Sequence, residues 1–234
     1  MIMVKPPYLV RKIYSSLVWR FSSEGQKIYL TFDDGPVPEI TPWVLDELKK
    51  HNAKATFFCV GQNVEKYPEI YKRIISEEHS VGNHTYDHLN GWKTKDAKYF
   101  ESIKKCADAL SAFSPSTWER DGVRLFRPPY GKLKKSQIKK IESRDKSQDP
   151  RANNLDSSIL TLDAKFKIIM WDVLSYDFDK NTTPEECYTN VVKHTQAGSI
   201  VVFHDSDKAQ DNLRYTLPKV FEYYTAKGYS FTSI

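Results

Sequence analysis

The stretch Thr31-Phe32-Asp33-Asp34-Gly35-Pro36 places two adjacent carboxylates at the end of an apolar run, directly before a Gly-Pro pair that stops the strand. Neighbouring side chains on a strand point to opposite faces, but two acids at the point where the chain turns can both reach one site. Two like charges this close are costly unless a cation or hydrogen bonds hold them. Asp-Gly is also common turn chemistry, so a simple surface turn is the alternative.

Strand-like and helix-like segments alternate after residue 27. Apolar runs predict seven strands, at 28–32, 55–60, 80–83, 123–126, 166–171, 199–204 and 229–234. Periodic apolar residues predict helices between them, at about 41–51, 94–113, 133–142, 183–198 and 213–227. A further helix is expected after Gly61, with helical spacing of Tyr67, Ile70, Tyr71, Ile74 and Ile75. The first of these helices is expected to begin with Thr41 as its N-cap and Pro42 in its first turn.

This alternation predicts an α/β fold with parallel strands and right-handed crossovers. An incomplete TIM-like barrel of the (β/α)7 type fits better than a doubly wound sheet, because no glycine-rich phosphate loop follows any strand. The 234 residues suffice for one domain, expected at 27–234, with residues 1–26 as an N-terminal extension and 143–164 as a polar insertion.

Composition excludes few function classes. A net charge of +5 does not by itself indicate nucleic acid, and no run approaches the roughly 18 apolar residues of a membrane span. The three cysteines are widely spaced and form no zinc-like pair. The 14 tyrosines and 5 tryptophans suit a sugar-binding cleft or, equally, an aromatic core.

Two basic segments are candidates for surface contacts. Residues 1–21 contain no convincing signal peptide, so the cytoplasm is the default location, although their basic and apolar residues could form a short interfacial helix or pack on their own domain. Residues 132–151 carry eight basic and three acidic residues. They could touch an anionic cell-wall polymer, or form a solvated helix and loop.

Polar clusters follow five of the predicted strands. They are Asp33-Asp34, His84-Thr-Tyr-Asp-His88, Arg127-Pro-Pro-Tyr130, Asp177 and His204. In (β/α) barrels the loops at the carboxyl ends of the strands build the active site, so these five clusters are expected to meet there.

A metal site is expected from the histidine pair and one acid. His84 and His88 are four residues apart, which on a helical turn places both imidazoles on one face. Two histidines and one carboxylate leave coordination positions open for water and substrate. Zinc is the first expectation for this divalent site, and ligand type does not exclude cobalt, nickel or iron.

The remaining polar residues suggest an acid, a base and their partners. One aspartate of the pair can bind the metal while its neighbour takes a proton from water. Arg127 could hold that base ionised, or form a structural salt bridge. Pro128-Pro129 makes the following turn rigid, and Tyr130 could offer its backbone N–H to an oxyanion or simply pack its ring.

His204 closes an apolar strand, where a histidine is often a core residue. Opposite a metal site it is a candidate general acid, because its ordinary pKa is near neutral. Such a histidine needs an orienting carboxylate. Asp177 is the first candidate and Asp205 is the local competitor.

Together these motifs resemble the polysaccharide deacetylases of the NodB-homology group, carbohydrate esterase family four, over about residues 27–234. The resemblance implies a distorted (β/α)7 barrel that hydrolyses the N-acetyl group of N-acetylglucosamine polymers or oligomers and releases acetate. It implies that Asp33 is the base, positioned by Arg127, and that Asp34, His84 and His88 hold the metal.

The resemblance further implies that the Tyr130 N–H stabilises the oxyanion and that His204, tuned by Asp177, protonates the leaving amine. The family often has Trp where this chain has Phe178. An aromatic wall of the substrate groove is therefore expected here, but without the hydrogen bond that an indole N–H could donate. An O-acetyl esterase of the xylan type and a small-molecule amidohydrolase are alternatives on the same barrel. A catalytically inactive sugar-binding protein is a third, although no ligand or base is missing here.

Overall fold

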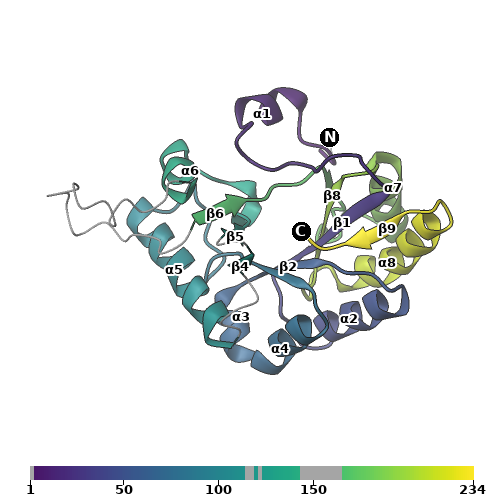
Figure 1. Cartoon of the computed structure of the whole chain (residues 1–234), viewed down its shortest axis with the longest axis horizontal. Helices are drawn as coiled ribbons and strands as arrows, with labels where there is room; N and C mark the ends of the chain where they lie inside the picture. Colours follow the sequence, from purple (N-terminus) through teal and green to yellow (C-terminus); the bar gives the residue numbers. More distant parts are fainter. Residues whose placement is uncertain (1–2, 114–118, 121–122, 143–164) are drawn as a thin grey trace, which may run out of the picture.

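The computed structural model describes residues 3–113, 119–120, 123–142 and 165–234, and these form a curled sheet with helices packed around its outer side (Figure 1). The predicted α/β fold, an incomplete TIM-like barrel in a single domain, is confirmed, and the described strands form a curled half-barrel. Among the described residues no helix has the length and apolar character needed to cross a bilayer.

The sheet contains nine strands in the described part of the chain. They are β1 (Lys27–Asp33), β2 (Thr56–Cys59), β3 (Ser80–Asn83), β4 (Glu119–Arg120), β5 (Val123–Phe126), β6 (Lys165–Ile168), β7 (Val173–Leu174), β8 (Ile200–His204) and β9 (Ser230–Thr232). Their order is β4-β5-β3-β2-β1-β8-β7, with β6 also pairing with β5 and β9 with β1. The hairpin pair of β4 and β5 is antiparallel, whereas the other pairs are parallel.

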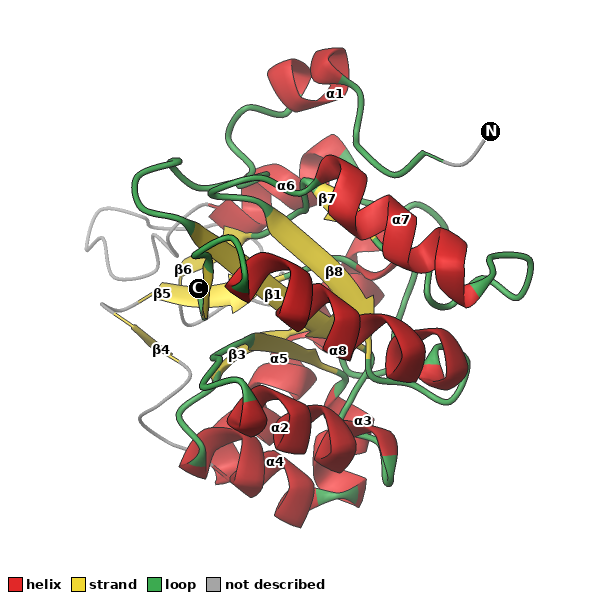
Figure 2. Ribbon diagram, turned by 90° about the vertical axis from the view of Figure 1, so that its right-hand side faces the viewer, coloured by secondary structure: helices red, strands yellow, loops and turns green. Residues whose placement is uncertain are grey.

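The helices connect these strands. They are α1 (Tyr8–Ile13), α2 (Ile40–Lys50), α3 (Gly61–Lys66), α4 (Pro68–Ser76), α5 (Asp96–Phe113), the 3-10 turn η1 (Pro129–Gly131), α6 (Lys135–Glu142), α7 (Pro184–His194) and α8 (Gln210–Thr225). Figure 2 shows α2 and α4 beneath the sheet, α7 and α8 along its side, and α1 standing apart at the top.

The core sits around the central strand β1. Phe32 is fully buried and stacks against Phe57 of β2 and Phe203 of β8. The near-continuous apolar strands are explained by this burial, since a parallel strand covered on both faces has no polar face to show. The register pairs Asp33, the last residue of β1, with His204, the last residue of β8.

The N-terminal segment completes the half-barrel. The backbone of Val18 donates to Ile168 O at 3.0 Å and accepts from Met170 N at 2.7 Å, beside the edge strand β6. At the other edge, Leu174 N of β7 donates to Val4 O at 2.9 Å. Residues 3–21 therefore pack on their own domain and cover backbone groups that an open sheet would leave unpaired.

Several predicted boundaries are wrong. Thr41 is not an N-cap, because α2 already begins at Ile40 and the Thr41 hydroxyl donates to Asp205 instead. The helix expected after Gly61 corresponds to α4, and the separate short helix α3 before it was not predicted; α7 ends at His194 rather than at 198. The short strands β4 and β7 were not predicted. The predicted insertion at 143–164 lies outside the described residues.

Candidate active site

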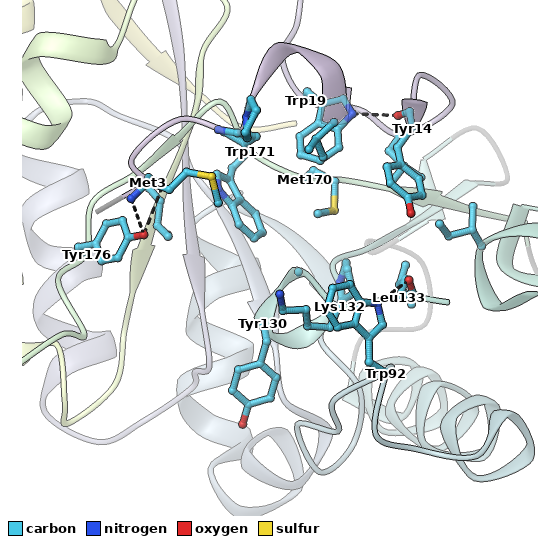
Figure 3. Close-up of a pocket in the computed structure, with 18 residues that line it drawn as sticks. Met3, Tyr14, Trp19, Trp92, Tyr130, Lys132, Leu133, Met170, Trp171 and Tyr176 are labelled. Atoms are coloured by element: carbon cyan, nitrogen blue, oxygen red, sulfur yellow. Dashed lines mark hydrogen bonds between the residues drawn. The ribbon is translucent and has the colours of Figure 1, made fainter. Parts of the chain in front are cut away.

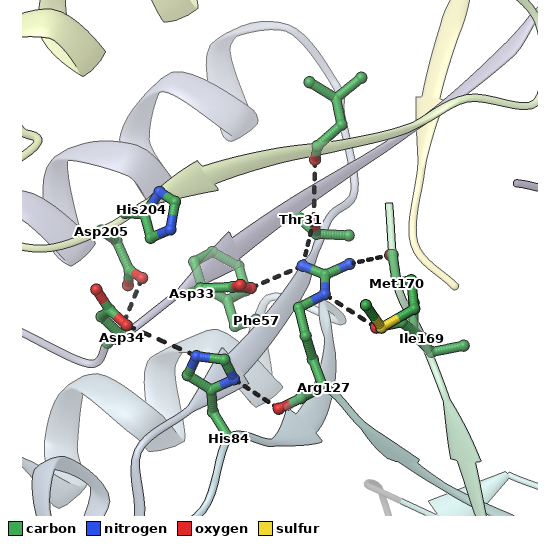
Figure 4. Close-up of polar contacts among 12 residues, drawn as sticks. Thr31, Asp33, Asp34, Phe57, His84, Arg127, Ile169, Met170, His204 and Asp205 are labelled. Carbon is green, nitrogen blue, oxygen red and sulfur yellow. Dashed lines mark hydrogen bonds and ion pairs between the residues drawn. The ribbon is translucent and has the colours of Figure 1, made fainter. Parts of the chain in front are cut away.

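Four parallel strands bring the predicted polar residues to one end of the sheet (Figure 4). Asp33 ends β1 and His204 ends β8, His84 follows β3, and Arg127 follows β5. The carboxyl ends of these strands meet because β1 pairs with β8 and β3 pairs with β5 in parallel. This arrangement is typical of active sites in barrels built from parallel strands.

Asp34, His84 and His88 form a cluster whose nitrogen and oxygen atoms lie within 4.8 Å of one another. Oδ1 of Asp34 is 3.1 Å from Nε2 of His88 and 3.7 Å from Nε2 of His84. The predicted helical turn between the histidines is wrong, because Thr85 and His88 have φ angles of 63° and 54°. A loop, not a helix face, makes the two rings converge.

The backbone conformation of Asp34 explains how the side chains of two adjacent acids face different partners. Its φ is 86°, a conformation that Asp tolerates better than most residues, and its carbonyl accepts a hydrogen bond from the Asn63 amide at 2.8 Å. The turn rotates the Asp34 side chain toward the histidines, whereas Asp33 stays in the strand and faces Arg127.

Electrostatics at this cluster favours a bound cation. Nδ1 of His84 lies 2.8 Å from the carbonyl oxygen of Arg127, which can only accept, so this nitrogen carries the proton. Burial lowers the pKa of His84 to about 4, so the neutral ring directs a lone pair on Nε2 at the Asp34 carboxylate. Two acceptors facing each other repel unless a positive charge lies between them.

The Asp34 carboxylate also requires a positive charge beside it. Its Oδ1 is buried and has no hydrogen-bond donor among the described residues. Burial alone would raise the pKa of Asp34, but the contact with His88 and the charges of His204 and His84 lower it overall. A buried, ionised oxygen without a donor is costly, and a divalent metal ion held by Asp34, His84 and His88 would satisfy it.

Asp33 is held by Arg127 at 2.7 Å between Oδ1 and Nη1. The guanidinium is fully buried and also donates to Thr31 Oγ1, Ile169 O and Met170 O. Burial lowers the pKa of Arg127, and the nearby Asp33 opposes that shift. The four donated bonds fix the guanidinium, so the Asp33 carboxylate has one defined orientation beside the cluster of Asp34, His84 and His88.

His204 is oriented by Asp177 on the opposite side of the site. Nδ1 of the ring is 2.8 Å from Asp177 Oδ1, and the His204 backbone N–H donates to Asp177 Oδ2 at 2.7 Å. Burial would lower the pKa of His204, but the Asp177 carboxylate outweighs it and raises that pKa to about 9. At neutral pH the ring is therefore protonated and can donate through Nε2.

The competing carboxylate, Asp205, faces away from the His204 ring and has another task. It accepts hydrogen bonds from Gly35 N at 3.1 Å and from the Thr41 hydroxyl at 2.6 Å, and burial raises its pKa to about 8. A side chain at Gly35 would overlap this carboxylate, which explains the glycine. Asp205 thus holds the turn after Asp34, a role that sequence reasoning missed.

The residues predicted to touch substrate or the oxyanion surround the same cluster. The Tyr130 ring is 59% exposed and lies 4.7 Å from the His88 ring, centroid to centroid. Pro128 is buried directly before the η1 turn. The Phe178 ring packs edge-on against His204 at 4.7 Å. The catalytic and binding roles of all these residues remain predictions.

Comparison with known proteins identifies the family. The family model described as polysaccharide deacetylase matches residues 22–145, more than half of the chain. The chain belongs to the polysaccharide deacetylase family. One relative, a peptidoglycan-N-acetylglucosamine deacetylase of Bacillus cereus, is 34% identical over 77% of this chain and 56% of its own length.

Other members of the polysaccharide deacetylase family match over more of their length. A second Bacillus cereus protein of the same name is 29% identical over 93% of this chain and 91% of its own length. A chitooligosaccharide deacetylase of Azorhizobium caulinodans is 29% identical over 80% of this chain and 77% of its own. By contrast, this chain spans only 38% of the length of a Listeria monocytogenes relative, so the relatives differ widely in length.

A solved structure supports both fold and family. A peptidoglycan N-acetylglucosamine deacetylase in complex with 4-naphthalen-1-yl-N-hydroxybenzamide superposes with a TM-score of 0.78 and 30% identity. The match covers 96% of this chain and 94% of that chain. The half-barrel is therefore the fold of this deacetylase as well.

Proposed function

We propose that this protein is a metal-dependent hydrolase that removes N-acetyl groups from N-acetylglucosamine-containing polysaccharides or oligosaccharides and releases acetate. The observation that carries the proposal is the buried, donor-free Oδ1 of Asp34 facing His84 and His88, with the Asp33–Arg127 pair beside it. The relatives named peptidoglycan-N-acetylglucosamine deacetylase and chitooligosaccharide deacetylase support the substrate class.

The donor set suits a divalent metal, with zinc as the first expectation and cobalt, nickel or iron also compatible with two imidazoles and one carboxylate. Asp34, His84 and His88 would hold the ion, which when bound would polarise the acetamide carbonyl and lower the pKa of a water molecule. Arg127 would fix the ring of His84 through its backbone carbonyl.

The chain's own residues supply the proton transfers. Asp33, kept in one orientation by Arg127, would take a proton from the attacking water, and the backbone N–H of Tyr130 would donate to the developing oxyanion. His204, protonated because Asp177 raises its pKa, would give a proton to the leaving amine. Phe178 would exclude water from the side of the His204 ring.

Acetate release tests the proposal directly. The protein is loaded with zinc, its metal content is measured, and acetate is quantified with chitin oligomers and acetylated peptidoglycan. We expect release from at least one N-acetylated glucosamine substrate and little from an O-acetylated xylan at equal acetyl concentration. Faster release from the ester would favour the esterase alternative, and no release from any substrate by metal-loaded protein would contradict catalysis.

The predicted contact of the N-terminus with a lipid surface also stays a proposal. The α1 residues Tyr8, Leu9 and Ile13 are about two-thirds exposed, and Lys12 lies beside them. Apolar groups flanked by bases suit an anionic membrane interface. Sedimentation with phosphatidylglycerol vesicles should carry the protein down, and Ile13→Asp should reduce this; equal binding to neutral vesicles and no effect of Ile13→Asp would contradict it.

A further inference from the structure

A pocket of about 520 Å³ lies beside the candidate active site, between the N-terminal segment and the η1 turn (Figure 3). Val10, Tyr14 and Trp19 form one wall, and Trp92 and Tyr130 form the opposite wall. Its volume is within the range of about 300–1,000 Å³ that is typical of pockets for small molecules. Of the residues with proposed catalytic or substrate-binding roles, Pro128 and Tyr130 line this pocket and the others do not.

Three polar groups of the aromatic walls already have partners inside the protein. The indole N–H of Trp92 donates to Leu133 O at 2.9 Å, and that of Trp19 donates to Tyr14 O at 2.9 Å. The Tyr176 hydroxyl is occupied by the backbone of Met3. These three groups are not available to a ligand, and most of the remaining lining is carbon of aliphatic and aromatic side chains, which favours an apolar group over a second sugar ring with its hydroxyls.

Ion pairs and a cation–π contact fasten the walls of the pocket. Buried Asp172 binds Arg11 at 3.0 Å and Lys5 at 3.4 Å, which fastens the N-terminal wall to the sheet. On the opposite wall the Lys132 ammonium lies 4.1 Å above the Trp92 ring, and Lys132 is the one charged side chain among the described lining residues. Because both walls are fixed, a ligand need not order them on binding.

Two aromatic contacts join the pocket to the catalytic residues. Tyr130 lines the pocket and packs against His88 at 4.7 Å. Tyr176 lines the pocket and stacks on Phe178 at 5.7 Å, which in turn contacts His204. Tyr130 and Tyr176 therefore border the pocket on one side and the residues of the candidate active site on the other.

We propose that this pocket binds an alkyl or aryl group that is attached to the glycan substrate. This inference rests on the proposed function for the identity of the substrate, but the pocket itself is defined by the apolar walls alone. The substrate class is then an N-acetylated glucosamine oligomer that carries a hydrocarbon substituent. Its apolar end occupies the space beneath the N-terminal segment.

A binding experiment without catalysis tests the pocket. Octyl β-glucoside, below its micelle concentration, is titrated against the protein and against methyl β-glucoside as the comparison, with tryptophan fluorescence as the readout. We expect the octyl compound to bind at least about tenfold more tightly, because several methylenes leave water. Equal affinities would overturn the proposal.

Two neighbouring α1 residues provide the matched control. Val10 lines the pocket, whereas Leu9 is 68% exposed and lies outside the lining. Val10→Asp should weaken octyl β-glucoside binding by about tenfold or more, and Leu9→Asp should leave it unchanged. If Leu9→Asp weakens binding as much as Val10→Asp, the ligand sits on the surface of α1 and the pocket assignment is wrong.

Acetate release then tests whether the apolar group belongs to the substrate. The octyl β-glycoside of an N-acetylglucosamine trimer should show a KM about tenfold below that of its methyl β-glycoside, and Val10→Asp should remove this difference. Tight binding of octyl β-glucoside with equal KM values would overturn the link to the substrate. Absence of acetate from both trimers would instead contradict the proposed function, while leaving the binding result intact.

Discussion

The backbone carbonyl of Arg127 accepts a hydrogen bond from His84 at 2.8 Å, while the side chain of the same residue holds Asp33 at 2.7 Å. One residue thus orients a candidate metal ligand through its main chain and the candidate base through its guanidinium. The two functions are separable, because a substitution at Arg127 removes the second and keeps the first.

Arg127→Lys should therefore retain the metal and lose activity. Lysine keeps a positive charge but cannot reproduce the four donated bonds, so Asp33 loses its fixed orientation. Arg127→Met leaves the carboxylate buried without a counter-charge and should lower the free energy of unfolding by about 3–5 kcal/mol, more than the lysine variant. Urea unfolding and metal content are measured for both variants. Loss of metal in a folded Arg127→Lys variant would contradict the idea that the main chain and the side chain of Arg127 have separate functions.

Asp177→Asn should move the alkaline limb of the pH profile of kcat downward. With Asp177 the pKa of His204 is raised to about 9, so the proton needed by the leaving group is lost only as the pH rises through that value. Removing the carboxylate removes the largest upward influence on the pKa of the ring, so that pKa should fall. An unchanged alkaline limb would exclude His204 as the acid; Asp207→Asn, at an exposed site, is the control.

His79 should make the protein less stable as the pH falls. Burial lowers its pKa to about 4, with Lys54 and Arg73 adding to the shift and Glu77 opposing it, and its Nδ1 accepts from Ala55 N. The unfolded chain takes up the proton from about pH 6.5 downward. The histidine should thus cost about 2 kcal/mol of stability at pH 5 relative to pH 8.

The matched variant is His79→Asn, whose amide oxygen can replace Nδ1 as the acceptor. The free energy of unfolding is measured in urea at pH 5 and pH 8 for both proteins. We expect the natural protein to lose more stability than the variant. An equal loss would mean that His79 titrates normally in the folded state.

Val18→Pro should destabilise the half-barrel more than Val18→Ala. Proline removes the N–H that donates to Ile168 O beside β6, whereas alanine keeps it. We expect the difference between the two variants to be about 1–3 kcal/mol in the free energy of unfolding. Equal stabilities would show that the N-terminal segment is not integral to the sheet.

The fold was predictable because its strands are apolar on both faces and its helices are periodic. The strands around Phe32, Phe57 and Phe203 are buried on both sides and end in polar residues, which also located the site. The two-residue strands β4 and β7 carry no such signal. The place of the N-terminal segment was also not predictable, because backbone hydrogen bonds such as that between Leu174 and Val4 leave no mark on composition.

Within the site, residue types were more informative than local geometry. The spacing of His84 and His88 suggested a helical turn, but positive φ angles at Thr85 and His88 bring the rings together by another route. Thr41 followed the sequence pattern of an N-cap, yet its hydroxyl is used by Asp205. Such long-range partners follow from tertiary packing, which a single sequence does not display.

The central claim is that the adjacent acids have different tasks, and one paired measurement tests it most directly. Metal content and acetate release are determined for Asp33→Asn and Asp34→Asn after loading with zinc. Asp33→Asn should keep its metal while acetate release falls by about 10²–10⁴-fold, and Asp34→Asn should lose the metal. Undiminished acetate release by Asp33→Asn, or full metal content in Asp34→Asn, would contradict the account.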